Sequence, residues 1–284
     1  MMMESGKRKN GKRRWISTGS RVQGASHIRN GQPCQDALSI KRDKDYHVIS
    51  VSDGHGSSQC PYSDEGAKAA VEVAYFVFDS IFKGRGDPFQ NFVANKDIWI
   101  PKQIEQNWKS MVTLIHGTRP VPFSYELYGA TLLTLVVAND FIFALQLGDG
   151  DILSIEPIST DGNQEDESQK KTQVDWVIPP DIRIGSETES LCQTDAWQYM
   201  KARIIPLGPE DTAPMFLLST DGYANSFNSN EGFKQAGADF YNLWEEEGLS
   251  FIDDNLEGWL MESSAQGSGD DIAVALVKEA VVGN

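Results

Sequence analysis

Short apolar runs rich in β-branched residues recur along the chain, and each ends at a polar turn. Runs of this kind, bounded by Gly, Asp and Ser, are typical of strands. We expect strands at 46–51, 129–138, 141–147, 151–155, 215–219 and 272–277. Asn139-Asp140 separates two of these runs, which predicts a hairpin with a two-residue turn. Residues 15–45 are rich in Gly and Ser and predict short strands broken by turns.

Four other segments carry apolar residues at helical spacing, and they fall into two pairs. The expected helices cover about 64–81, 102–115, 232–244 and 249–263. Residues 83–95 and the charged stretch 159–171 predict loops. Strands interrupted by paired helices favour an antiparallel sheet sandwich flanked by helices over an alternating βαβ fold. We expect one domain over 15–284, preceded by a flexible basic tail over 1–14.

Charge is unevenly divided between the N-terminus and the rest of the chain. The net charge is −16, yet residues 7–14 hold six Lys or Arg. Without residues 1–14, 19 basic side chains stand against 40 acidic ones, a net charge of −21. The acidic part of the chain after residue 14 should repel nucleic acid and concentrate divalent cations. The basic tail is interpreted as a solvated terminus, with an acidic partner or a localisation signal as the alternative.

Neither membrane insertion nor a disulfide framework is indicated. No apolar run approaches the roughly 20 residues that span a bilayer, and no apolar segment follows the basic N-terminus as in a secretory signal. Cys34, Cys60 and Cys192 are widely spaced and odd in number. We therefore expect a cytoplasmic protein that contacts no membrane and no nucleic acid.

Aspartate stands beside glycine at four strand ends. These residues are Asp53, Asp149, Asp221 and Asp270, and Asp36 precedes a further short strand. Asp-Gly is common turn chemistry, so a single instance is more often structural. Because the central strands of a sandwich bring their ends together, several of these residues could converge on one pocket.

Converging carboxylates repel one another unless cations neutralise them. Oxygen ligands without paired His or Cys select Mg²⁺, Mn²⁺ or Ca²⁺, and the chain has no EF-hand loop. Two hard ions that share a carboxylate suit in-line displacement at phosphorus, with a metal-bridging water as the nucleophile. The pattern thus favours phosphate ester hydrolysis at a magnesium or manganese centre.

Six ordered motifs resemble those of a known family. They are CQDA (34–37), VSDGHGS (51–57), YGATLL (128–133), LGDGD (147–151), STDG (219–222) and GDDIAVALV (269–277). Together they resemble the metal-dependent Ser/Thr protein phosphatases of type 2C, the PPM family, and particularly its divergent bacterial members. The resemblance covers about residues 20–278. It implies an α+β fold, a four-layer α/β/β/α sandwich of two antiparallel sheets flanked by helix pairs.

The resemblance also implies hydrolysis of phosphoserine and phosphothreonine on proteins, with a dinuclear Mg²⁺ or Mn²⁺ centre. Asp53 would bridge the two ions, and the Gly54 carbonyl would help to bind one of them. Asp221 and Asp270 would hold the other ion. The family pattern places Asp271 in the position of a following Asn, so Asp270 is preferred to Asp271 as the ligand.

Further roles follow from the same resemblance. Asp36 would act through water in a second shell, and Asp149 could contribute to a third metal site. His55 would be the general acid that protonates the leaving oxygen, since an imidazole with a pKa of about 6.5 suits proton transfer near neutral pH. Many members carry an Arg shortly before this motif that binds phosphate; here the upstream segment offers both His27 and Arg29, and which of them, if either, contacts phosphate stays open.

Two other functions are compatible with the sequence. One is a phosphatase-like module that binds a partner without turnover, and the other is a phosphoesterase for small molecules or nucleotides. Asp53, His55, Asp221 and Asp270 are all present, which favours the active protein phosphatase. We expect phosphoprotein substrates, a monomer, and a substrate-shaping flap within residues 172–204.

Overall fold

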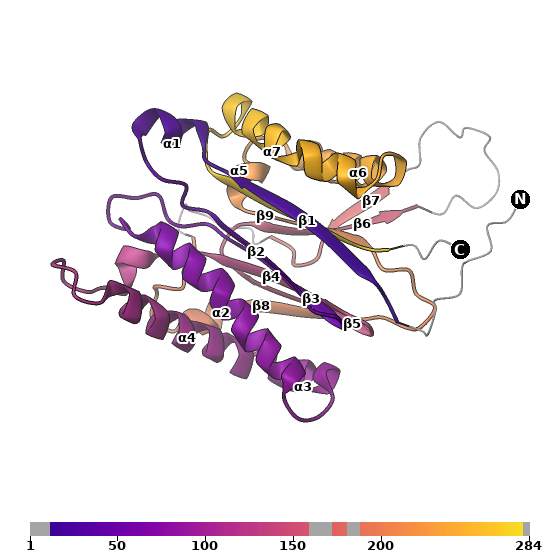
Figure 1. Cartoon of the computed structure of the whole chain (residues 1–284), viewed down its shortest axis with the longest axis horizontal. Coiled ribbons are helices and arrows are strands. Elements are labelled where there is room, and N and C mark those ends of the chain that lie inside the picture. Colours follow the sequence, from indigo (N-terminus) through magenta and orange to yellow (C-terminus); the bar gives the residue numbers. More distant parts are fainter. Residues whose placement is uncertain (1–11, 159–171, 181–187, 281–284) are drawn as a thin grey trace, which may run out of the picture.

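Two five-stranded antiparallel sheets form the centre of the molecule (Figure 1). The computed structural model describes residues 12–158, 172–180 and 188–280. Sheet A has the order β1 (Trp15–Val22), β10 (Ile272–Glu279), β9 (Met215–Ser219), β6 (Asp151–Pro157) and β7 (Thr172–Trp176). Sheet B has the order β2 (Ala37–Arg42), β3 (Tyr46–Ser52), β4 (Leu132–Ala138), β5 (Phe141–Leu147) and β8 (Lys201–Pro206).

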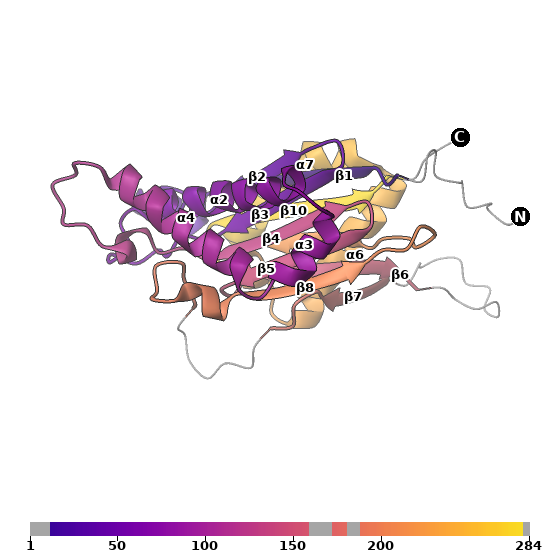
Figure 2. The same cartoon turned by 90° about the horizontal axis from the view of Figure 1, so that it is seen from below.

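Helices cover the outer face of each sheet. Sheet A is covered by α6 (Asn230–Glu246) and α7 (Leu249–Gln266), and sheet B by α2 (Ser63–Lys83), α3 (Pro88–Asn95) and α4 (Trp99–His116), as Figures 1 and 2 show. Two short helices, α1 (Ala25–Asn30) and α5 (Asp221–Ala224), lie at the ends of sheet A strands. The expected four-layer α/β/β/α sandwich is confirmed. None of the helices in the described part of the chain is long and apolar enough to cross a membrane.

The central strands are buried on both faces, which explains their continuous apolar runs. In β4, Leu133 and Leu135 pack between the two sheets, whereas Leu132 and Val136 pack under the helices of sheet B. Strand β10 follows the same alternation toward its own helices. Because a shift of one residue would exchange the two faces of a strand, this double burial fixes the register. The strand ends are therefore held in definite positions.

Most expected elements are present with bounds that differ by a few residues, but the helices α1, α3 and the four-residue α5 were missed. Helix α3 occupies much of the predicted loop 83–95, and α1 lies in a segment expected to hold only strands and turns. The segment 172–204, expected to form a flap, supplies β7 to sheet A and the start of β8 to sheet B. The predicted loop 159–171 falls outside the described residues.

The described part of the chain begins at residue 12, before the predicted domain boundary at residue 15. Arg13, counted in the predicted tail, is buried and donates hydrogen bonds to the backbone carbonyls of Asn139, Gly208 and Asp211. Its guanidinium also pairs with Glu279 at the end of β10. Arg13 therefore ties the N-terminus to both sheets, while residues 1–11 of the predicted tail lie outside the described part.

Replacing Arg13 by Met should lower the free energy of unfolding by about 3 kcal/mol or more, because the hydrogen bonds of its buried guanidinium to three backbone carbonyls and its ion pair with Glu279 are lost. The matched control is Lys12→Met. Lys12 pairs with Asp45 on the surface, where both side chains are more than half exposed, and such pairs contribute less than about 1 kcal/mol. Urea unfolding of the two variants measures both values. Equal losses would show that Arg13 has no special structural role.

Candidate metal centre

Three aspartates from three strand ends meet at one edge of the sandwich. Asp53 follows β3, Asp149 follows β5, and Asp221 follows β9. One carboxylate oxygen from each residue lies within 4.8 Å of the other two. Asp53 and Asp221 are partly buried, and Asp149 is exposed. The expected convergence of distant strand ends is thus present for these three residues.

The turn that carries Asp53 is fixed by backbone contacts. The Asp53 N–H donates to the Thr131 hydroxyl at 2.9 Å, and the Asp53 carbonyl accepts from the Thr131 N–H at 2.8 Å. Next to it, Gly54 forms an isolated bridge with Ala130. A Cβ atom on Gly54 would come within 2.6 Å of the Ser63 carbonyl oxygen and 2.8 Å of that of Gln35. Only glycine fits here, and the close packing holds the Asp53 carboxylate in place.

Asp36 lies buried beneath this group. Its Oδ2 accepts a hydrogen bond of 2.6 Å from the Thr220 hydroxyl, and only 1% of the residue is exposed. Burial raises the pKa of the Asp36 carboxyl, and the neighbouring charges of Asp271 and Asp221 raise it further. This inner position is compatible with the indirect role expected for Asp36.

The raised pKa values of Asp53 and Asp221 indicate that the clustered aspartates lack a counter-charge among the described residues. Burial is the main cause that raises the pKa of Asp53, and the charges of Asp36, Asp221, Asp270 and Asp149 add to it. Burial and the charges of Asp149 and Asp270 raise the pKa of Asp221 to about 7. Carboxylates that keep their protons for lack of a counter-charge are suited to a divalent cation. With oxygen donors only, the site fits Mg²⁺ or Mn²⁺.

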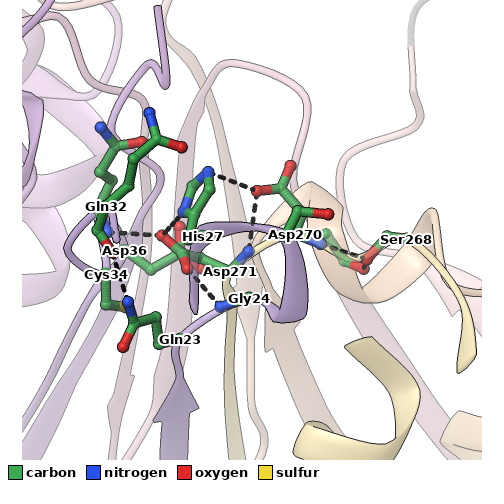
Figure 3. A network of polar contacts seen from close by, with 12 residues as sticks. Gln23, Gly24, His27, Gln32, Cys34, Asp36, Ser268, Asp270 and Asp271 are labelled. Carbon is green, nitrogen blue, oxygen red and sulfur yellow. Dashed lines mark hydrogen bonds and ion pairs between the residues drawn. The ribbon is translucent and has the colours of Figure 1, made fainter. Parts of the chain in front are cut away.

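The adjacent Asp270 and Asp271 have different surroundings, as Figure 3 shows. Asp271 is buried, and its carboxylate accepts hydrogen bonds from the Gly24 and Gln35 N–H groups, both at 2.6 Å. Asp270 has a half-exposed side chain, and its charge acts on Asp53 and Asp221. Asp271 is thus engaged by two backbone donors in a buried place, whereas Asp270 accepts one backbone hydrogen bond, from the Asp271 N–H at 2.8 Å, and its side chain is half exposed.

The two candidate phosphate-binding residues, His27 and Arg29, also differ in their contacts. His27 lies between the two acids, with Nδ1 2.9 Å from Asp271 Oδ2 and Nε2 3.8 Å from Asp270 Oδ1 (Figure 3). Arg29 is exposed and donates a hydrogen bond to the Ser26 hydroxyl on its own helix, α1. The structure therefore brings His27 to the carboxylates of the candidate site, whereas the hydrogen bond of Arg29 stays within α1.

His55 stands at the other side of the Asp53 turn. Its N–H donates to the Gly129 carbonyl at 3.0 Å, and a Cβ on Gly129 would lie 2.6 Å from the His55 ring. Burial lowers the pKa of His55, and the nearby charge of Asp149 opposes this effect only in part. The expectation of an ordinary imidazole pKa was therefore wrong, because the ring packs against the Gly129 backbone away from water.

Several supporting residues escaped the sequence analysis. Thr131 holds Asp53, Thr220 holds Asp36, and the Thr188 hydroxyl donates to Asp149 Oδ2 at 2.5 Å. Thr131 and Thr220 lie within the GATLL and STDG motifs, so the motifs could have indicated them. Thr188 lies 39 residues from Asp149 in a segment without a recognisable motif. Only the fold reveals that contact.

Comparison with known families identifies the family of this chain. The profile described as "Protein phosphatase 2C" matches residues 23–261. The chain belongs to the protein phosphatase 2C family. The sequence-based identification of a serine/threonine phosphatase family is confirmed. A search of curated proteins finds no match.

Solved structures of protein phosphatase 2C relatives share the fold at low sequence identity. A bacterial serine phosphatase matches with a TM-score of 0.61 and 15% identity, over 95% of this chain and 99% of that chain. RsbX in complex with magnesium matches with a TM-score of 0.54 and 14% identity, over 94% and 96% of the two chains. The catalytic domain of PstP, a phosphatase of Mycobacterium tuberculosis, was solved with 2 manganese ions. It matches with a TM-score of 0.55 and 14% identity, over 94% and 98%.

The raised pKa of Asp221 predicts a loss of stability with rising pH in the wild type that Asp221→Asn lacks. The folded protein holds this proton up to about pH 7, whereas the unfolded chain releases it near 3.8. Because the folded state then binds more protons, the carboxyl lowers stability as pH rises through this window. Without metal, Asp221→Asn should therefore gain stability over wild type from about pH 4 to 7, by on the order of 1–4 kcal/mol.

Chemical unfolding in EDTA across this pH range measures the difference, and exposed Asp254→Asn is the control that should show no such slope. Adding Mn²⁺ should reverse the order, because the wild-type carboxylates gain from cation binding. A difference between wild type and Asp221→Asn that is constant with pH would contradict the proximity of the charges. Equal stabilisation of both proteins by Mn²⁺ would contradict Asp221 as a ligand.

Proposed function

We propose that this phosphatase hydrolyses phosphoserine and phosphothreonine on proteins at a centre of two Mg²⁺ or Mn²⁺ ions. The observation that carries the proposal is the meeting of Asp53, Asp149 and Asp221 within 4.8 Å. These residues come from three strands in two sheets, and no need of the fold itself explains why three repelling charges should be brought together. Structures of relatives with magnesium or manganese ions support the choice of cation.

Each acidic residue has a separate proposed task. Asp53, with the most crowded carboxylate, would contact both ions, and the Gly54 carbonyl would assist with one of them. Asp221 and Asp270 would hold the second ion, while Asp36 would act through water. Asp149 would contribute to a third, weaker site together with Asp221. When bound, the ions would neutralise charge on the phosphate and lower the pKa of water.

His55 would donate a proton to the leaving serine or threonine oxygen. Its backbone N–H is fixed to Gly129, which holds the ring beside the acidic group. Because burial lowers its pKa, the protonated fraction of His55 already falls at pH values below the ordinary value near 6.5. A phosphate ester with a poor leaving group should therefore be hydrolysed more slowly at higher pH, as far as this step limits the rate.

His27 is our choice for the phosphate contact. Its Nδ1 faces the buried Asp271 carboxylate, whose two backbone donors hold it in one orientation. This arrangement would give Nδ1 the proton and turn Nε2 toward the site. The Arg29 guanidinium bonds to Ser26 instead. We further propose that the substrates are phosphoproteins and that the enzyme acts as a cytoplasmic monomer.

Hydrolysis of a phosphothreonine peptide by the purified protein should require Mn²⁺ or Mg²⁺. Asp53→Ala should lower kcat by several orders of magnitude, because the charge stabilisation from bound metal is lost. The exposed Asp254→Ala is the control and should leave kcat unchanged. Nucleotides and small phosphate esters assayed beside the peptide separate the alternative functions. Undiminished turnover in EDTA would refute the metal centre, and faster hydrolysis of nucleotides would refute the protein substrate.

Substitution of His55 and of His27 should change different kinetic constants. His55→Ala should reduce kcat for a phosphothreonine peptide far more than for p-nitrophenyl phosphate, whose leaving group needs no proton. His27→Ala should instead raise KM for both substrates, because it removes a phosphate contact. Arg29→Ala serves as the control for His27 and should leave KM unchanged.

Steady-state kinetics of the three variants at saturating Mn²⁺ test this division. If His55→Ala slows both substrates equally, His55 is not the acid. If Arg29→Ala raises KM as much as His27→Ala does, the phosphate contact has been assigned to the wrong residue.

A further inference from the structure

A glutamine interrupts the apolar inner face of β5. In this strand, Ile142 and Ala144 pack between the two sheets, and the next residue on the same face is Gln146. Only 8% of Gln146 is exposed. An amide is costly in such a place unless it is hydrogen-bonded, so its partners indicate what the side chain is for.

Gln146 binds the backbone on both sides of Asp149. Its Nε2 donates to the Gly148 carbonyl at 3.2 Å and to the Gly150 carbonyl at 2.7 Å. The turn between them needs glycine at its start, since Gly148 has φ of +103°. One side chain therefore spans the turn that presents the Asp149 carboxylate to Asp53 and Asp221.

The turn is packed closely by neighbouring strands and also borders a cavity. A Cβ atom on Gly148 would lie 2.5 Å from the Thr131 side chain, and one on Gly150 would lie 2.5 Å from the Ser219 carbonyl oxygen. Gly148, Asp149 and Gly150 also line a cavity of about 90 Å³ beside Gln146. The hydrogen bonds from Gln146 add to this packing and hold the carbonyls on both sides of Asp149.

Fold stability alone does not account for glutamine at this position. The Gln146 Oε1 is buried and accepts no hydrogen bond within the described part of the chain, which costs stability. A hydrocarbon side chain of similar size would avoid that cost. The amide is explained by its two donated hydrogen bonds, both of which end on the Asp149 turn.

We infer that Gln146 is a positioning residue that sets the metal affinity of Asp149. This inference rests on the proposed function, in which Asp149 contributes to the weakest cation site. Groups that orient a metal ligand change affinity by about 10-fold to 100-fold when they are removed. Loss of the Gln146 amide should act on this site and leave the sites that depend on Asp53 and Asp270 nearly unchanged.

Calorimetric titration of metal-free protein with Mn²⁺ tests the inference. Gln146→Met keeps the length of the side chain and removes both donated hydrogen bonds, and it should raise the Kd of the weakest site about 10-fold or more. Gln146→Glu, which also lacks the amide donors, provides a second protein if the methionine variant does not fold. Far-UV circular dichroism and the metal-free Tm identify folded variants independently of metal binding.

A double-mutant cycle with Asp149→Asn shows whether Gln146 acts through Asp149. Asp149→Asn should weaken the weakest site, and Gln146→Met should have no additional effect on its Kd in that background. A wild-type Kd in folded Gln146→Met would overturn the inference, as would an equal weakening of all sites or additive effects in the cycle. Tight Mn²⁺ binding and phosphopeptide turnover that persist in these cases would leave the proposed function standing.

Discussion

Electrostatic repulsion among carboxylates is the constraint on which the rest of this structure depends. Asp53, Asp149 and Asp221 are held within 4.8 Å, and the partial burial of Asp53 and Asp221 removes water that would otherwise screen their charges. Burial and the charges of Asp149 and Asp270 together raise the pKa of Asp221. Three like charges stay together only if the surrounding scaffold is stiff enough to resist their separation. A divalent cation converts the same repulsion into attraction, which makes the arrangement a binding site.

The stiffness comes from strands that are buried on both faces. Strand β4 packs toward the other sheet through Leu133 and toward the helices through Leu132, so it can neither slide nor turn over. The neighbouring strands β3 and β5 are fixed to it by regular antiparallel pairing. Their ends therefore deliver Asp53 and Asp149 to set positions. Small contacts then complete the placement, such as the Thr131 hydrogen bonds to the Asp53 backbone.

Sequence reasoning succeeded where strong local patterns carry the information. The long apolar runs predicted the central strands, and the Asp-Gly ends of these strands predicted Asp53, Asp149 and Asp221 as neighbours. It failed for α1, which buries none of its residues, and for α3, which buries only Phe92. Helix α1 has no buried face to reveal it, and α3 has only eight residues, so its apolar spacing repeats over too short a stretch to stand out. The roles of Arg13, Thr188 and Gln146, and the lowered pKa of His55, depend on contacts that only the folded chain creates.

The adjacent acids Asp270 and Asp271 show how one fold separates structural charge from functional charge. Asp271 is deeply buried, but two backbone N–H groups and His27 surround its carboxylate. These contacts tie β10 to the segments around Gly24 and Gln35. Asp270 is half exposed, and its charge acts on Asp53 and Asp221. Because hydrogen bonding stabilises a buried anion as effectively as a cation does, burial alone could not identify the ligand. What distinguishes the two residues is the group that stabilises each carboxylate. For Asp271 this group is the backbone, and for Asp270 it is the cation in our proposal.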